Sequence, residues 1–212
     1  MRVAFVLSFA VLVGIGCEDP GAKVTPATVG APAPTKAESA PTGANPAPTA
    51  TALVIDPSNS KVEFVGAKVT RSHGGGFTDF AGKVELAEPT ESSHVEITIQ
   101  TASLYADEEK LAKHLKSPDF FDVNDFPTAT FRSTEIKKRA DDYQVTGDLT
   151  LHGVTKRVSF PATIQVSDGA VKASSEFSIN RHDFGISYPG MKDDLIRDLV
   201  VIKLRVDLPR QS

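Results

Sequence analysis

The 212-residue sequence predicts an all-β domain of about eight antiparallel strands with one short helix, preceded by an export signal and a disordered linker. Three observations support this prediction. Apolar and polar residues alternate from Leu53 onward, turn-forming residues separate the alternating runs, and the preceding segment is rich in Pro, Ala and Thr without any aromatic residue. We therefore divide the chain into a signal peptide over 1–16, a linker over 17–52 and a folded domain over 53–209.

The N-terminus has the pattern of a secretory signal. One positive charge at Arg2 precedes an apolar run from Val3 to Ile15 and a small residue before Cys17. The run is shorter than the roughly 20 apolar residues that cross a bilayer. Cys17 is the single cysteine of the chain. Its position resembles the bacterial lipoprotein signal, in which the thiol is lipidated, although Gly14 stands where leucine is usual.

This resemblance implies an exported protein, lipidated at Cys17 and anchored in a membrane of the cell envelope, facing the periplasm. The alternative is an incidental cysteine beside an ordinary cleavage site. From 18 to 52 the sequence cannot bury enough apolar surface to offset its chain entropy, so we expect an extended, mobile tether. The formal charge of −4 argues against nucleic acid as a partner.

Period-two alternation locates the strands. It is clear in Val95, Ile97 and Ile99, and it extends over a longer stretch from Val158 to Val166. Turn signals include His152-Gly153, Asp168-Gly169 and the run 74–76, which consists of three glycines. The predicted strands lie near 60–70, 77–87, 93–101, 128–138, 142–152, 154–167, 170–180 and 198–208.

One helix interrupts the strands. Acidic residues at 107–109 suit its first turn, Leu111 and Leu115 follow at helical spacing, and Pro118 stops it. Eight antiparallel strands with one dry face form either a sandwich or a closed barrel. A barrel of this size is either filled by side chains or holds one small ligand, and the pattern alone leaves these alternatives open.

Three segments together resemble one family. They run over 114–131, which contains Ser117-Pro118-Asp119-Phe120-Phe121, over 147–158, which contains Leu151-His152-Gly153-Val154-Thr155, and over 178–186. Their order and spacing are similar to those of the YceI family, also called the polyisoprenoid-binding or lipid-binding family, from about Leu53 to Leu208. The resemblance implies a lipocalin-like, eight-stranded antiparallel barrel whose interior holds the tail of a long isoprenoid or a similar amphiphile.

The candidate ligand-binding residues are aromatic and leucine side chains. Those on strands either line a channel or fill a solid core, and the absence of Trp favours a cavity. The phenylalanines after the helix either form a flap over the barrel mouth or close its bottom. The candidates are Phe64, Phe77, Phe80, Leu111, Leu115, Phe120, Phe121, Phe126, Phe131, Leu149, Leu151, Phe160, Phe177 and Phe184.

The sequence offers little chemistry for catalysis. His73 and the three glycines after it resemble the oxyanion motif of some esterases, but the chain has no G-x-S-x-G elbow. The five histidines do not pair at metal-ligand spacing, so we expect no metal and no cofactor. Arg181 is expected to pair with Asp183 or a buried carbonyl, or to hold a ligand head group.

These observations predict a non-catalytic protein that binds an apolar or amphiphilic, polyisoprenoid-like lipid inside its barrel while lipidated Cys17 holds it at the membrane. The alternatives are a lipid-modifying enzyme and an envelope interaction protein with a filled barrel and no ligand. The sequence also allows a homodimer.

Overall fold

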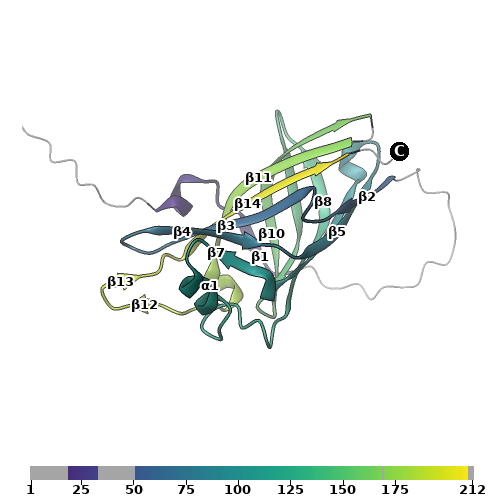
Figure 1. Ribbon diagram of the computed structural model, residues 1–212. Coiled ribbons are helices and arrows are strands. Elements are labelled where there is room, and N and C mark those ends of the chain that lie inside the picture. The colour runs from purple at the N-terminus through teal and green to yellow at the C-terminus, as the bar shows by residue number, and fades with distance from the viewer. Residues whose placement is uncertain (1–18, 33–50, 169, 210–212) are drawn as a thin grey trace, which may run out of the picture.

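Antiparallel strands make up most of the residues that the computed structural model describes, which are 19–32, 51–168 and 170–209 (Figure 1). The expected signal peptide, the lipidation site Cys17 and most of the expected linker lie outside the described residues. No helix in the described ranges has the length and apolar character needed to cross a bilayer.

One large sheet contains all but two of the strands. They follow the order β2-β5-β6-β8-β9-β10-β11-β14-β3-β4-β7, and β1 pairs with β10 beside this path. The strands are β1 (Thr28–Gly30), β2 (Thr51–Ile55), β3 (Ser60–Ala67), β4 (Ser72–Phe77), β5 (Phe80–Leu86), β6 (His94–Gln100), β7 (Leu104–Ala106), β8 (Thr128–Lys138), β9 (Tyr143–Leu151), β10 (Val154–Ser167), β11 (Ala170–Asn180) and β14 (Leu199–Leu208).

A separate two-stranded hairpin consists of β12 (Gly190–Met191) and β13 (Asp194–Leu195). Among the described residues, the one α-helix is α1 (Glu109–Leu115), which confirms the predicted helix. The same ranges contain four short 3-10 helices: η1 (Pro20–Lys23), η2 (Thr90–Ser92), η3 (Thr101–Ser103) and η4 (Arg181–Phe184).

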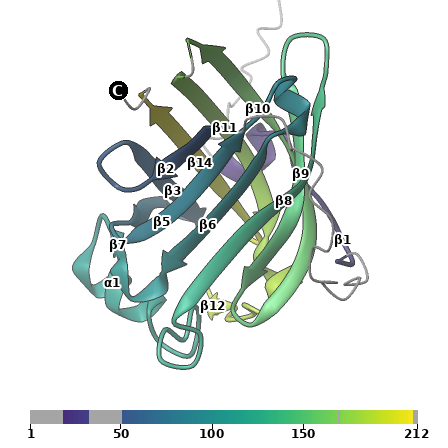
Figure 2. The same ribbon diagram turned by 90° about the vertical axis from the view of Figure 1, so that its right-hand side faces the viewer.

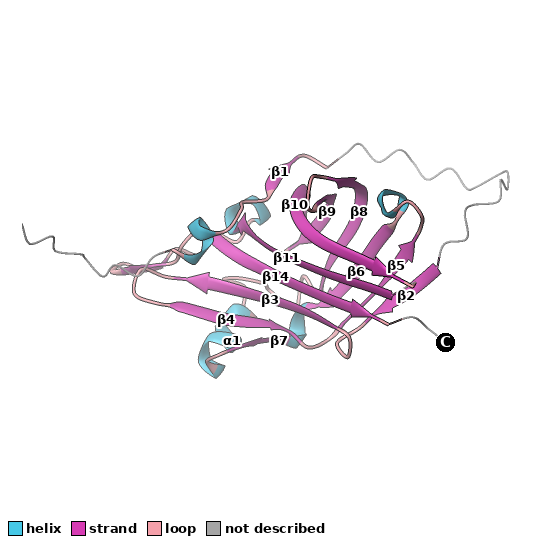
Figure 3. Cartoon of the chain, turned by 90° about the horizontal axis from the view of Figure 1, so that it is seen from above, coloured by secondary structure: helices cyan, strands magenta, loops and turns pink. Residues whose placement is uncertain are grey.

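The large sheet is curled, and its concave face encloses an interior (Figures 2 and 3). Alternation explains this shape, because each long strand turns its apolar side chains toward the same interior. On β10, for example, Val158, Phe160 and Ala162 are buried while their neighbours are more exposed. At the turn before β10, His152 and Gly153 both have positive φ, as a tight two-residue reversal requires.

The predicted strands are present, but their number is too low. Each of the eight predicted segments contains a strand, and the sheet also contains β1, β2, β4 and β7, which were not predicted. The path ends at β2 and β7, so the structure is a curled sheet, a half-barrel, in place of the expected eight-stranded barrel.

The three glycines at 74–76 were misread as a turn, since they lie within β4. Their role is close approach. A Cβ at Gly75 would collide with the ring of Phe64, and a Cβ at Gly76 would collide with the ring of Tyr105. A strand that must pass beneath two aromatic rings therefore carries glycine, although glycine is unfavourable in strands generally.

The expectation of a mobile tether is wrong for residues 19–32. The N–H of Ala27 donates to the carbonyl of Ser178 on β11 (2.8 Å), and β1 pairs with β10 through Val29 and Val158. These residues fill the seam where β10 and β11 separate beyond their paired stretch. Its composition did not predict this order, because the segment is held by hydrogen bonds to the open edges of β10 and β11 and not by an apolar core of its own.

Two apolar clusters stabilise the sheet. One centres on Phe160, Phe177 and Phe184, and the other joins Leu53 and Ile55 of β2 to residues including Phe80, Val84 and Leu208. The second cluster depends on β2, a segment at the linker–domain boundary for which the sequence predicted no strand. Strand β2 therefore belongs to the core of the domain.

Candidate functional site

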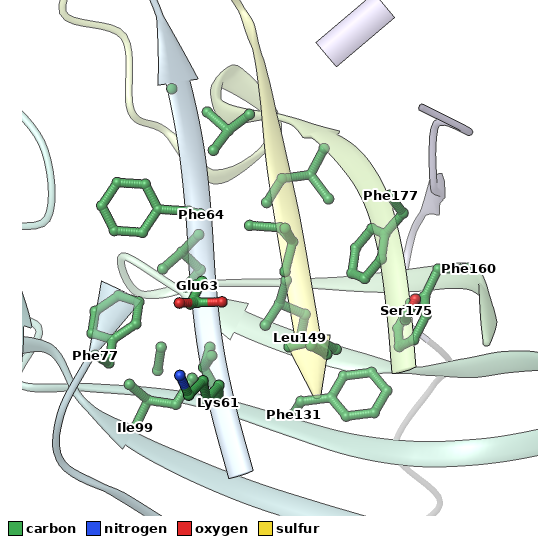
Figure 4. A pocket seen from close by; sticks show the side chains of 18 of the residues that line it. Lys61, Glu63, Phe64, Phe77, Ile99, Phe131, Leu149, Phe160, Ser175 and Phe177 are labelled. Carbon is green, nitrogen blue, oxygen red and sulfur yellow. The ribbon is translucent and has the colours of Figure 1, made fainter. Parts of the chain in front are cut away.

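An apolar cavity of about 830 Å³ lies inside the curled sheet. This volume falls in the range of roughly 300–1,000 Å³ that is usual for small-molecule sites. Figure 4 shows Phe64, Phe77, Ile99 and Phe131 around it, together with Phe177 of β11. The wall extends along β3 from Ser60 to Ala67, so the cavity is elongated along the strands, over about 23 Å at 3.3 Å per residue.

Aromatic rings line two sides of the cavity. On one side Phe160 stacks on Phe177 with ring centroids 4.2 Å apart, and Phe131 contacts Phe160 at 5.7 Å. On the other side Phe77 lies 6.1 Å from Phe64 and 5.8 Å from the loop residue Phe121. Ring pairs at these separations are mutually stabilising, so the rings hold one another in place around the cavity.

Helix α1 and the loop after it cover one end of the cavity. Leu111 and Leu115 of the helix line it, together with Phe120 and Phe121. The ring of His114 contacts both Phe120 and Tyr188, each at a centroid distance of 5.0 Å. This aromatic cluster joins the helix to the segment that leads into β12.

Eleven of the fourteen candidate residues border the cavity. They are Phe64, Phe77, Leu111, Leu115, Phe120, Phe121, Phe131, Leu149, Leu151, Phe160 and Phe177. They come from six strands, the helix and the following loop, so the fold brings together segments that are far apart in the sequence.

Three candidates do not line the cavity. Phe80 is buried in the apolar cluster around β2, and Phe184 is fully buried in the cluster around Phe160. Phe126 packs against the ring of His152, 4.5 Å away, where it covers Gly153 at the β9–β10 turn. All three therefore pack within the structure. Alternation predicts that a side chain is buried, but it does not separate residues of the core from residues of the cavity wall.

Sequence reasoning missed part of the lining. Ile202 and Leu204 of β14 line the cavity, and the alternation of that strand was visible in the sequence. Gly66 of β3 also lines it, and a Cβ added there would meet nothing within 4 Å. Tyr188 and Ile196 come from the irregular segment around β12 and β13, for which the sequence carried no periodic signal.

Polar groups are concentrated at the end near α1, β12 and β13. His73 forms a hydrogen bond with Asp107 (2.9 Å), and His114 forms one with Asp119 (2.8 Å). Burial acts to raise the pKa of Asp107, but hydrogen bonds from His73 and the Gly74 N–H outweigh it, so this pKa lies below its ordinary value. Exposed Met191 and Glu108 border the cavity here, so we call this end the mouth.

Arg181 is a structural clamp. Its guanidinium donates to the carbonyls of Ile186 (2.9 Å), Arg197 (3.1 Å) and Ile196 (3.5 Å). Of the expected partners, buried carbonyls are present, while the closest carboxylate is that of Asp198, 3.7 Å away, in place of Asp183. Desolvation lowers the pKa of Arg181, against an opposing effect of Asp198. The side chain fixes the segment that carries β12 and β13.

Metal-binding groups are scattered. Within the described ranges, no three His, Cys, Asp or Glu side chains are close enough together to hold a metal ion.

The polar residues that Figure 4 labels are Lys61, Glu63 and Ser175, and the Ser175 hydroxyl donates to the carbonyl of Pro161.

The fold and cavity together define a class of protein in which a curled antiparallel sheet encloses an apolar interior. Within this class the chain belongs to the YceI family, because the YceI-like domain matches residues 53–208. Residues 19–32, which seal the seam between β10 and β11, lie outside the matched domain.

Curated relatives support the family membership. A UPF0312 protein of Pseudomonas putida is 41% identical over 125 residues, which cover 55% of this chain and 65% of the relative. A UPF0312 protein of Pectobacterium atrosepticum is 45% identical over 91 residues, covering 42% of this chain and 47% of the relative. The matched part thus spans less than two thirds of the length of these relatives.

Two solved structures share the fold. BcnA of Burkholderia cenocepacia superposes with a TM-score of 0.66 at 24% identity, covering 74% of this chain and 99% of BcnA. A polyisoprenoid binding domain from Saccharophagus degradans, implicated in plant cell wall breakdown, gives a TM-score of 0.62 at 14% identity, covering 76% and 99% of the two chains. At these identities the likeness is one of fold.

Proposed function

We propose that this protein binds an apolar or amphiphilic lipid, of polyisoprenoid type, inside its curled sheet without transforming it. The observation that carries the proposal is the elongated cavity of about 830 Å³, whose wall is made mainly of Phe, Leu, Ile and Val side chains. An open volume of this size also argues against the alternative of a filled, ligand-free interior. The fold shared with a polyisoprenoid binding domain is consistent with such a ligand.

The energetics suit a long hydrocarbon chain. Burial contributes about 0.8 kcal/mol per methylene group, so ten enclosed methylenes contribute roughly 8 kcal/mol before the costs of association. A wall of this composition selects a ligand by its length and shape. The polar groups at the mouth, among them His73 and His114, are placed to contact a head group.

We further propose that the protein is exported and lipidated at Cys17, so that it works at the cell envelope. The signal-like N-terminus supports this proposal. We assign binding in preference to a lipid-modifying activity because most of the residues that line the cavity are aliphatic or aromatic, whereas proton transfer or nucleophilic attack requires a constellation of reactive side chains.

A blocking substitution tests the binding proposal. Leu149 lines the cavity from β9, and Leu149→Trp places a larger ring in that space. The next residue, Thr150, is outside the cavity lining, so Thr150→Trp is a matched control on the same strand. The assay is displacement of an apolar fluorescent probe by a prenyl alcohol, using a chain that begins at Glu18 and therefore retains every described residue.

We expect Leu149→Trp to weaken prenyl-alcohol binding at least about tenfold, while Thr150→Trp binds like the unchanged protein. Equal binding by the two folded variants would place the ligand elsewhere and reject the proposal. Turnover of an added prenyl ester that Leu149→Trp abolishes would favour the enzymatic alternative.

A further inference from the structure

Two turns project together from the mouth end of the fold (Figures 1 and 3). One joins β3 to β4, and the other is the tip of the β12–β13 hairpin. The N–H of Val69 donates to the carbonyl of Leu195 (3.1 Å), and the Thr70 hydroxyl donates to the carboxylate of Asp194 (3.0 Å). These contacts make the two turns one projecting unit.

Apolar side chains are exposed on this unit. Met191 is 72% exposed, Leu195 51% and Val69 45%. These three residues, which we call the apolar tip, are half of the six large hydrophobic side chains that are exposed among the described residues. Single exposed hydrophobic residues are ordinary on protein surfaces, but three on one projecting unit make it a candidate interaction surface.

The apolar tip presents hydrophobic side chains on both faces of its hairpin. Met191 is paired with Asp194, and Leu195 is paired with Gly190. Directly opposed residues of an antiparallel pair share a face, and successive residues alternate, so Met191 and Leu195 point to opposite faces. A flat protein partner would cover one face only, whereas a fluid apolar medium would cover both.

The first described residues pack beside the base of the two turns that carry the apolar tip. Gly21 in η1 is so close to Leu199, at the start of β14, that an added Cβ would meet the Leu199 side chain. Two residues earlier, the N–H of Arg197 donates to the carbonyl of Ala67, at the base of the β3–β4 turn. Cys17 is four residues before Gly21, a chain length of at most about 14 Å.

Charge around the apolar tip is nearly balanced. Three cations, Lys68, Arg71 and Lys192, lie in the same two hairpins as the carboxylates of Asp193 and Asp194. Lys68 forms an ion pair with Asp194, and Arg71 forms one with Glu108. Because the charges nearly cancel, the tip has no strong preference for an anionic surface, and burial of its apolar side chains would drive contact.

We propose that the apolar tip inserts into the head-group region of the membrane that holds lipidated Cys17, so that the cavity mouth faces the bilayer. This inference rests on the proposed function. Met191 belongs to the apolar tip and also lines the cavity at its mouth, so a lipid could pass from the bilayer into the cavity with little exposure to water. The acyl anchor and the tip would act together, since one weak membrane contact gives only reversible binding.

A fluorescence experiment tests the insertion. The chain that begins at Glu18 lacks Cys17, so Met191→Cys introduces a unique thiol for an NBD label. Asp141→Cys supplies the matched label in the exposed β8–β9 connection. With phosphatidylcholine vesicles that contain a nickel-chelating lipid, which holds the chain by an added N-terminal histidine tag in place of the acyl anchor, we expect a blue shift and quenching by brominated lipid for the label at 191 and no change for the label at 141. Equal responses at the two positions, or no response at 191, would overturn the proposal.

Charge substitutions provide a second measurement. We expect Val69→Asp combined with Leu195→Asp to reduce flotation with phosphatidylcholine vesicles about tenfold. Val54→Asp combined with Val166→Asp replaces residues of similar exposure, 52% and 43%, away from the tip and should leave flotation unchanged. An equal loss in both pairs would contradict a specific role for the tip.

Probe binding in the absence of vesicles separates this inference from the proposed function. If the variant with Val69→Asp and Leu195→Asp binds the apolar fluorescent probe normally but no longer floats with vesicles, membrane docking and ligand binding are distinct and both proposals stand. If the unchanged protein floats through its tip but binds no probe, the docking proposal stands and the proposed function fails.

Discussion

Gly66 offers the sharpest test of where a ligand lies. It lines the cavity from β3, between Phe64 and Ala67, and a Cβ added to it would meet nothing within 4 Å. Gly66→Leu therefore directs four side-chain carbons into the cavity from a Cβ that meets no neighbour. The fold should not suffer, because glycine within a strand is less stable than a residue with a side chain by roughly 0.5–1 kcal/mol.

The expected loss follows from the displaced ligand atoms. Four carbons of leucine exclude about four methylene groups of a bound chain, which at about 0.8 kcal/mol each amounts to roughly 3 kcal/mol. This corresponds to about a 150-fold increase in Kd, since 1.4 kcal/mol is about a factor of ten.

A series of linear alcohols of increasing length gives the assay. For the unchanged protein, calorimetric affinity should rise with each methylene and then level off when the cavity is full. For Gly66→Leu the plateau should come about four carbons earlier. Gly74→Leu is the matched control, because Gly74 also has no neighbour within 4 Å of an added Cβ but does not line the cavity.

A folded Gly66→Leu variant that kept both the affinity and the plateau of the unchanged protein would show that the ligand does not occupy the cavity beside Gly66. The same conclusion would follow if Gly74→Leu shortened the plateau to the same extent, because the effect would then not depend on cavity volume.

Three other predictions concern the parts that shape the cavity. Arg181→Met leaves three carbonyls without their donor and should lower the free energy of unfolding by roughly 3 kcal/mol in urea titration; an unchanged midpoint would contradict the clamp. Gly21→Ala should detach residues 19–32 and speed their proteolysis about tenfold relative to Gly30→Ala, whose added Cβ has no close neighbour; equal rates would show that the segment is not held there. Hydrogen bonds from Lys68 and Thr70 hold the pKa of Asp194 below its ordinary value, so the stability this contact provides is present above that value and is lost as pH falls through the lower folded-state pKa. Below about pH 4, hydrogen exchange at β12–β13 should therefore accelerate, and Asp194→Asn should remove this pH dependence.

The long strands could be predicted because apolar and polar residues alternate along them, which indicates one buried face and one exposed face. The predicted limits of 128–138 and 154–167 coincide with β8 and β10; alternation is continuous from Val158 to Val166 of β10, whereas β8 has a register shift between Ser133 and Glu135. Strand β4 could not be predicted, because its glycines are explained by the rings of Phe64 and Tyr105, which lie elsewhere in the sequence. Strand β1 was missed for a related reason, since its pairing depends on the gap between β10 and β11.

Much of the candidate site was predictable by residue type, but its boundary was not. Phe77 and Phe80 lie three residues apart on successive strands, yet Phe77 lines the cavity and Phe80 is buried in the core. Both have the same sequence signal, which reports that a side chain avoids water. Whether neighbouring side chains meet behind it or leave a space depends on the curvature of the whole sheet.

The central claim is that the curled sheet holds a lipid chain, and the lipid content of the purified protein tests it most directly. The protein would be purified without detergent and extracted with organic solvent, and the extract analysed by mass spectrometry beside an equal amount of Gly66→Leu. We expect about one long-chain lipid per molecule in the unchanged protein and a shorter or absent lipid in the variant. Protein that carries no lipid and takes up none when a prenyl lipid is added would contradict it.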